Sequence, residues 1–176
     1  MSIKNNMKTV NFFRAAIALL MMLLTTATAW ADIEGNGTEN EPFMLKTAAD
    51  WATFAANVNA GTNADKYYKL DDSWDNSANA VTATVGTSDH PFTGTLDGNG
   101  QTLTVSIDDT SNQGTAPFRY ISGGAVIKNL TVTGSVTGTT HAAGLVGLSK
   151  DGSAESPNII EGCTVNVNVT VNTGSN

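Results

Sequence analysis

The sequence predicts an all-β protein, a right-handed parallel β-helix with one N-terminal capping α-helix. Short segments rich in Val and Thr alternate apolar and polar residues with a period of two, which is typical of strands. Similar segments return about 27 to 33 residues apart, and repetition at such a spacing indicates a solenoid. One segment has helical spacing of apolar residues, near the start of the chain.

Residues 1–31 have the pattern of a secretory signal. Lys4, Lys8 and Arg14 precede or border an apolar run over 15–24, and Ala29-Trp30-Ala31 is a small-x-small cleavage site. The apolar run is too short to cross a bilayer. The pattern predicts cleavage after Ala31, no membrane span in the mature chain, and a secreted or outer cell-surface location in a bacterium.

The composition of the mature chain excludes several classes of function. Six Lys and Arg remain after the predicted signal, against 16 Asp and Glu, so the net charge is −10. Nucleic acid is therefore not an expected partner, because a phosphate backbone is bound by clustered basic residues. Cys163 is the single cysteine, so no internal disulfide forms; its place in an alternating segment predicts a buried small hydrophobe.

Residues 32–66 are predicted to be an extended lead-in followed by the capping helix. Phe43, Leu45 or both are expected to dock on the core. Thr47 suits the helix N-cap, and Asp50, three residues later, can bond back to the capping residue. Gly61 ends the helix. The helix would present one apolar face made of Trp51, Phe54, Ala55 and Val58.

Residues 67–176 are predicted to form the coils and to be the start of a longer array, in which each strand stacks on its equivalent. The first strand is expected at Tyr67–Leu70 and a second at Val81–Val85. A tight turn at 97–100 (Asp-Gly-Asn-Gly) follows a strand, because Gly, Asp and Asn tolerate the backbone angles of such a turn. The alignment predicts two inward ladders: Leu103, Leu130 and Cys163 in one, and Val105, Val132 and Val165 in the other.

A second pair of similar segments supports the same repeat. Residues 117–122 match residues 144–149 at an offset of 27, and the later increase to 33 falls in a loop over 150–158. Insertions confined to one loop are typical of a solenoid.

The order of several short motifs resembles the GLUG-repeat surface proteins. The motifs cover most of residues 43–170: Asn59-Ala60-Gly61 after a helix, Phe92-Thr93-Gly94, the turn at 97–100, Phe118, Ile127 to Val132, and Gly144-Leu145-Val146-Gly147. The resemblance implies a right-handed parallel β-helix on the surface of Bacteroidetes-like bacteria, often adhesive. Some relatives are large secreted peptidases whose repeats are not catalytic. About three coils are expected here, whereas the relatives continue further.

Three aspartates could form a metal site. Asp71, Asp72 and Asp75 lie within five residues, and carboxylate oxygens are the ligands that Ca²⁺ prefers. Their spacing matches no ordered calcium loop, so an acidic turn is the competing interpretation. No other cofactor is expected.

Aromatic residues are the candidates for ligand binding, because carbohydrate binders present exposed rings for stacking. Trp51 belongs to the apolar face of the helix, which leaves Trp74, Tyr67, Tyr68 and Tyr120. Trp74, which lies among the acids, is the strongest of them. The expected partner is a host glycan or a surface protein.

Catalytic motifs are scarce. The sequence has no HExxH, GxSxG, P-loop or CxxC spacing. Asp97, Asp108 and Asp109 are candidates for the paired acids of a carbohydrate-active enzyme, a polysaccharide lyase or hydrolase. Few basic residues accompany them, so the predicted function is adhesin-like binding or a structural spacer, without catalysis.

The last strand has no visible protection of its edge. The valines at 165, 167, 169 and 171 alternate with polar residues that include Asn166, Asn168 and Asn172, and no Lys or Pro follows. Natural sheet edges usually carry such residues or are covered. This predicts that the edge continues into further repeats or self-associates with another chain; the alternative is a short tail that folds back.

Overall fold

The computed structural model describes residues 33–150, 153 and 155–172. The predicted signal lies outside the described residues. One compact unit, Ile33–Asn176, contains the elements described here. In chain order they are β1 (Phe43–Leu45), α2 (Ala48–Asn59), β2 (Tyr67–Leu70), β3 (Thr95–Asp97), β4 (Thr102–Gln113), β5 (Phe118–Ser122), β6 (Val126–Lys128), β7 (Thr131–Thr140), β8 (Val146–Lys150), β9 (Ile159–Glu161) and β10 (Thr164–Val171).

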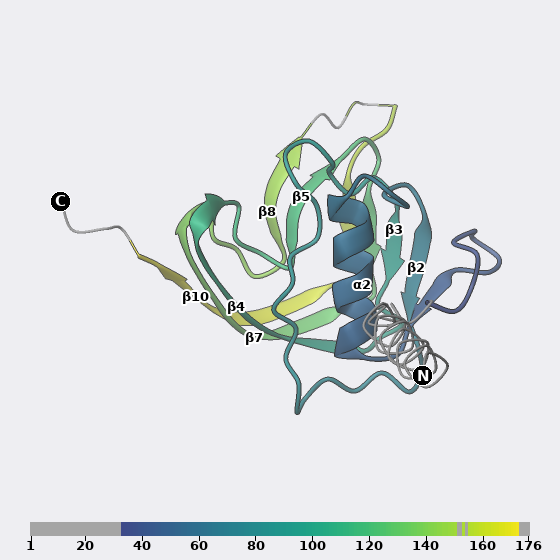
Figure 1. Ribbon diagram of the computed structural model, residues 1–176, viewed down its shortest axis with the longest axis horizontal. Coiled ribbons are helices and arrows are strands. Elements are labelled where there is room, and N and C mark those ends of the chain that lie inside the picture. The colour runs from purple at the N-terminus through teal and green to yellow at the C-terminus, as the bar shows by residue number, and fades with distance from the viewer. Residues whose placement is uncertain (1–32, 151–152, 154, 173–176) are drawn as a thin grey trace, which may run out of the picture. The chain divides into compact units, whose positions relative to one another are not determined.

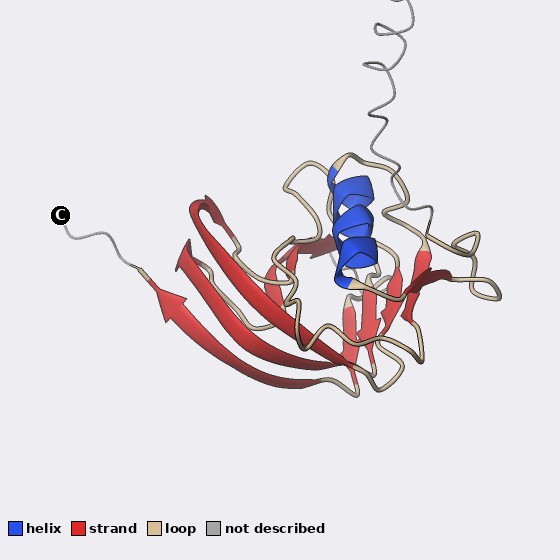
Figure 2. Ribbon diagram, turned by 60° about the horizontal axis from the view of Figure 1, so that its bottom comes forward, coloured by secondary structure: helices blue, strands red, loops and turns tan. Residues whose placement is uncertain are grey.

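The strands form three parallel sheets that wind into a β-solenoid of about four turns (Figures 1 and 2). Sheet A has the order β1-β2-β3-β6-β9, sheet B the order β10-β7-β4, and sheet C contains β5 and β8. Each complete coil passes from sheet A to sheet B to sheet C, and equivalent strands pair in parallel. The predicted parallel β-helix is confirmed, with about four turns rather than three.

The helix begins and ends where the sequence predicts. Thr47 is the N-cap: its Oγ1 accepts from the Asp50 amide at 3.3 Å, and Asp50 Oδ2 accepts from the Thr47 amide at 2.9 Å. Gly61 follows the C-terminus with a φ of +80°, a conformation that glycine adopts without strain. No helix in the described part of the chain is both long enough and apolar enough to span a membrane.

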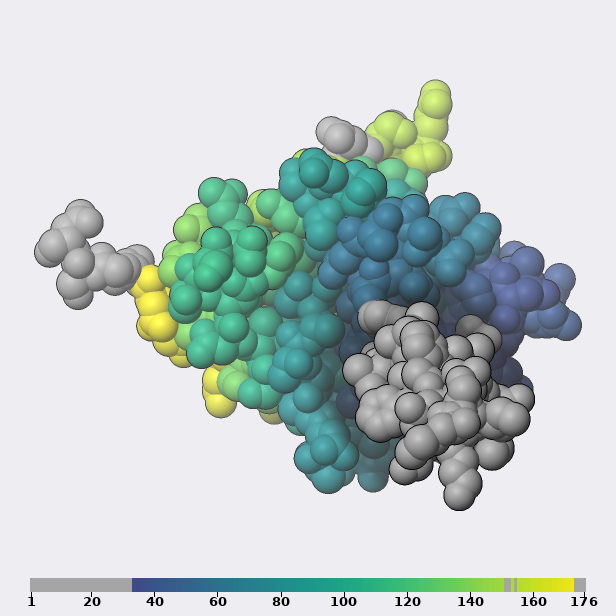
Figure 3. All heavy atoms as spheres, in the orientation of Figure 1, coloured from purple at the N-terminus to yellow at the C-terminus, as the bar shows by residue number. Residues whose placement is uncertain are grey.

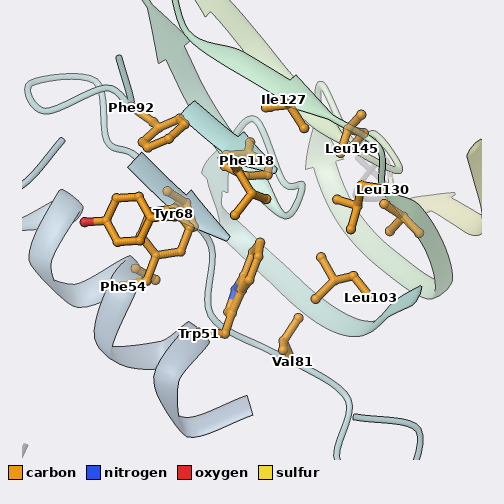
Figure 4. Packing of buried hydrophobic residues seen from close by; sticks show 14 of the residues in the cluster. Trp51, Phe54, Tyr68, Val81, Phe92, Leu103, Phe118, Ile127, Leu130 and Leu145 are labelled. Atoms are coloured by element: carbon orange, nitrogen blue, oxygen red, sulfur yellow. The ribbon is translucent and has the colours of Figure 1, made fainter. Parts of the chain in front are cut away.

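One face of α2 packs into the N-terminal part of the solenoid interior. Trp51 and Phe54 are fully buried and project from the helix toward the sheets (Figure 4). The Trp51 ring meets Phe118 edge-on at 5.7 Å, and the Phe54 ring lies 4.1 Å from Tyr68 and 5.5 Å from Phe92. Tyr68 lies in sheet A and Phe118 in sheet C, and Phe92 makes an isolated bridge to Ile121 of sheet C. All three belong to the first two coils, so the helix caps the core as predicted.

The register between the second and third coils differs from the predicted one. Leu103 pairs with Val132, not Leu130, so the first ladder is Leu103, Val132 and Val165. The turn between β3 and β4 has four residues, whereas the turn between β6 and β7 has two. Alignment of short apolar segments cannot detect this difference in turn length.

The offset in sheet C also differs from the predicted 27 residues. Phe118 pairs with Val146 and Tyr120 with Leu148, an offset of 28. A register shift lies between Asp109 and Gln113 near the end of β4. This irregularity changes the offset before the chain enters sheet C, so no single spacing describes the repeat.

The predicted strand at Val81–Val85 is wrong. Val81 and Val85 each make one isolated parallel bridge, to Val105 and Phe118. Between them the backbone carbonyls bond to the helix instead, because Trp51 Nε1 donates to the Ala83 carbonyl at 3.0 Å and Asn59 Nδ2 to the Thr84 carbonyl at 2.9 Å. The two ends of the segment therefore bond to β4 and β5, whereas its middle bonds to α2, and no continuous strand forms.

Candidate functional site

Two of the predicted stacking residues lie in the core. The Trp74 side chain is 5% exposed, and its Nε1 donates to the Thr102 carbonyl at 2.9 Å. Tyr68 is 1% exposed, its hydroxyl donates to the Asn63 carbonyl at 3.0 Å, and burial raises the pKa of the phenol. The expectation that these rings are exposed is corrected: each polar tip finds a backbone partner, which allows the ring to be buried.

Tyr120 is half-buried on sheet C. The Lys150 ammonium lies over its ring, 5.3 Å from the centroid, and also donates to the Ser88 carbonyl. One ring face is therefore occupied by a cation–π contact within the chain.

Two of the three aspartates of the predicted metal site serve local turns, and the third contacts the turn of the next coil. Asp71 Oδ1 accepts from the Ser73 hydroxyl and amide, which lower the pKa of that carboxyl. Asp75 Oδ1 accepts from the Ser77 amide, and Asp72 Oδ1 from Asn99 Nδ2. No group of three His, Cys, Asp or Glu side chains within the described residues converges as metal ligands would. A calcium site at these residues therefore finds no support in the geometry.

Asp97, Asp108 and Asp109 do not form paired acids. Asp97 lies on sheet A, whereas Asp108 and Asp109 are adjacent in β4, and neighbouring residues of a strand point to opposite faces. Asp109 binds the Arg119 guanidinium. Asp109 is therefore engaged in an ion pair with Arg119, and no second carboxylate of the three faces it as a catalytic partner would.

Cys163 is partly buried beside the core rather than fully buried. Its Sγ donates weakly to the Glu161 carbonyl at 3.4 Å, and burial raises the pKa of the thiol. A raised pKa disfavours the thiolate that nucleophilic chemistry needs.

The outer face of sheet A carries the candidate site. Tyr68, Leu96 and Ile127 point inward, so their neighbours in the same strands point outward. Register places Lys69, Asp97 and Lys128 side by side, and Tyr67 beside Thr95. The side chains form a groove of about 370 Å³, which the loop containing Glu39 also lines. We call this the sheet A groove.

The charges of the sheet A groove are balanced. Lys128 Nζ lies 3.9 Å from Asp97 Oδ2, and the two side chains are 34% and 29% exposed. Asp97 Oδ1 accepts from the Asn99 amide at 2.9 Å and from Asn129 Nδ2 at 3.2 Å, which holds the carboxylate in place. The groove can therefore offer one aromatic ring, two amines and carboxylate oxygens to a polar ligand.

Sequence reasoning named three residues that line this groove, Tyr67, Tyr68 and Asp97, but not Lys69 or Lys128 as members of a site. Lys69 and Lys128 belong to different coils, and only the parallel register brings them to the same carboxylate. The spacing of Lys69, Asp97 and Lys128 is 28 and 31 residues, so no regular spacing of charges marks them in the sequence.

Comparison with known proteins gives one partial match. No protein-family model matches the chain, and no solved structure matches it. The chain is similar to halomucin from Haloquadratum walsbyi, with 31% identity over 126 residues. The match covers 65% of this chain but 1% of halomucin, so the chain spans a very small part of its curated relative. The resemblance to GLUG-repeat proteins stays a prediction.

Proposed function

We propose that this chain is a repeat module of an exported surface protein, which binds a host glycan or surface protein in an adhesin-like way without catalysis. The sheet A groove carries the proposal, because it gathers Tyr67, Lys69, Asp97 and Lys128 on a rigid parallel sheet. Export is supported by the basic, apolar and small-residue order of residues 1–31.

The chemistry of the groove favours a neutral, hydroxyl-rich ligand. The positive charges of Lys69 and Lys128 are balanced by the negative charges of Asp97 and Glu39, so neither sign of charge dominates the groove. Amines donate to hydroxyl oxygens and carboxylates accept from hydroxyl protons, while the Tyr67 ring supplies an apolar surface for a sugar ring. A neutral glycan uses all three kinds of contact.

The test is a glycan and host-protein array probed with the secreted chain. We expect binding that falls about tenfold or more in Tyr67→Ala, because a lost stacking contact of about 1.4 kcal/mol corresponds to that factor. Tyr120→Ala is the matched control, since it removes an aromatic ring from sheet C.

Three outcomes would contradict the proposal. Absence of any retained ligand would favour a structural spacer. Loss of binding in Tyr120→Ala alone would place the site on sheet C. Release of shortened oligosaccharides from a bound glycan would indicate a carbohydrate-active enzyme.

A further inference from the structure

A second cavity lies between α2, the segment 81–85, β4 and β5. It has a volume of about 370 Å³ and shares no lining residue with the sheet A groove. Figure 3 shows this part of the surface, where the chain before β3 (teal) runs between α2 (blue) and the far part of β4 (green). Every residue that lines the cavity lies between positions 52 and 119, so no wall depends on the last coil. We call it the helix cavity.

Two buried polar atoms of residues that line the helix cavity have no hydrogen-bond partner among the described residues. One is Oδ1 of Asn59, an acceptor, and the other is Nε of Arg119, a donor. The Asn59 amide has a fixed orientation, because its Nδ2 donates to the Thr84 carbonyl at 2.9 Å, and its oxygen is therefore the free atom. Arg119 binds Asp109 through Nη2, which leaves Nε unpaired. Unpaired buried atoms are rare in folded proteins and indicate a place where a ligand or a water can pair.

Small apolar residues line the same cavity. Ala52, Ala55 and Ala56 lie on one face of α2, three or four residues from one another or from Asn59. An acetamido group combines a methyl group, one amide donor and one carbonyl acceptor. Its N–H can donate to Asn59 Oδ1, its carbonyl can accept from Arg119 Nε, and its methyl group can pack on the alanines.

We propose that the helix cavity binds the acetamido group of an N-acetylated sugar. Thr82 and Asp108 line the same cavity and are exposed, so their hydroxyl and carboxylate can bond to the hydroxyl groups of the sugar ring. An acylated lysine would instead place an aliphatic stem against these polar groups. A neutral ligand also leaves the ion pair of Asp109 and Arg119 intact. The helix cavity is separate from the sheet A groove, so either proposal can fail alone.

The test follows the NMR signals of the ¹⁵N-labelled secreted chain during titration with N-acetylglucosamine. Arg119 is the only arginine after residue 31, so the arginine Nε–H signal of the secreted chain is unambiguous. We expect this signal and the side-chain amide signals of Asn59 to shift saturably. The Kd should be on the order of 1 mM, which suits a ligand of about fifteen non-hydrogen atoms. Glucose, which has a hydroxyl in place of the acetamido group, should shift neither signal.

Ala56→Leu should weaken the binding of N-acetylglucosamine about tenfold or more, because the larger side chain fills space that the acetamido methyl group needs. Ala49→Leu is the matched control. It makes the same change at an exposed position of α2 that does not line the cavity, so binding should be unchanged. The backbone amide signals of each variant show whether it is folded.

Four outcomes would overturn the proposal. Equal shifts with glucose would indicate a site for hydroxyl groups in general. Shifts with N-methylacetamide but not with N-acetylglucosamine would indicate an acylated amine or a peptide rather than a sugar. Unchanged signals of Arg119 and Asn59 with every probe would mean that water alone pairs these atoms. Shifts confined to Lys69, Asp97 and Lys128 would place the sugar in the sheet A groove and would contradict this inference alone.

Discussion

Arg119 and Asp109 form the most buried ion pair among the described residues, with 15% and 19% of their side chains exposed. Asp109 also accepts hydrogen bonds from the Ser111 amide and from the amide and Nδ2 of Asn112. Burial alone would raise the pKa of Asp109. The hydrogen bonds from Asn112 and Ser111, together with the charge of Arg119, outweigh burial and lower it.

Asp109→Asn should lower the free energy of unfolding by about 2 kcal/mol at neutral pH, because it leaves Arg119 without its counter-charge. A lowered folded-state pKa means that this stability is present above the unfolded value of about 3.9 and lost as pH falls through the folded value. Urea unfolding of both proteins should therefore give a difference that shrinks in acid. A difference independent of pH would assign the effect to packing.

Gly134 has no side chain, and this allows the third coil to approach the backbone of the second coil closely. It pairs with Val105 and Val167 in sheet B, and its φ is +108°. A Cβ at this position would lie 2.0 Å from the Val105 carbonyl oxygen. Only glycine fits, so the inward ladder of valines has a gap in the third coil.

At the scale of elements, α2 and the segment 81–85 act together. The helix supplies Trp51 and Phe54 to the core and also binds the carbonyls of Ala83 and Thr84. A stretch with strand-like alternation is thereby held beside the helix, because its hydrogen-bonding groups already have partners.

Trp51→Ala and Phe54→Ala should each lower the free energy of unfolding by about 3–5 kcal/mol, as truncations of buried aromatic residues do. Chemical denaturation measures this directly. Ala52→Lys is the control, since Ala52 is exposed on the same helix and its change should stay within about 0.5 kcal/mol. Similar small losses for Trp51→Ala would mean that the helix does not close the core.

At the scale of the whole molecule, stability comes from stacking coils that cannot bury their apolar residues alone. Ladders such as Leu96, Ile127 and Ile160 run through successive coils. The same parallel register also aligns the outward side chains of the proposed glycan groove, Lys69, Asp97 and Lys128.

Export should remove residues 1–31. The expected result is a secreted protein whose first residue is Asp32, because Ala29-Trp30-Ala31 has the small residues that signal cleavage requires. N-terminal sequencing of the secreted protein measures the cleavage site. A protein that retains Met1 would contradict the signal prediction.

The sequence by itself determined the Thr47 and Asp50 cap, the stop at Gly61 and the strand Tyr67–Leu70, because these depend on hydrogen bonds and periodicities within a few residues. It also determined the parallel β-helix, because similar segments return about 27 to 33 residues apart. It did not predict the first strand, β1 (Phe43–Leu45), which the sequence placed in the extended lead-in. Only the tertiary structure decided the register, the burial of Trp74 and the groove that joins Lys69, Asp97 and Lys128. The physical reason is that neighbours in a solenoid lie about thirty residues apart, and turns of two or four residues change which side chains meet.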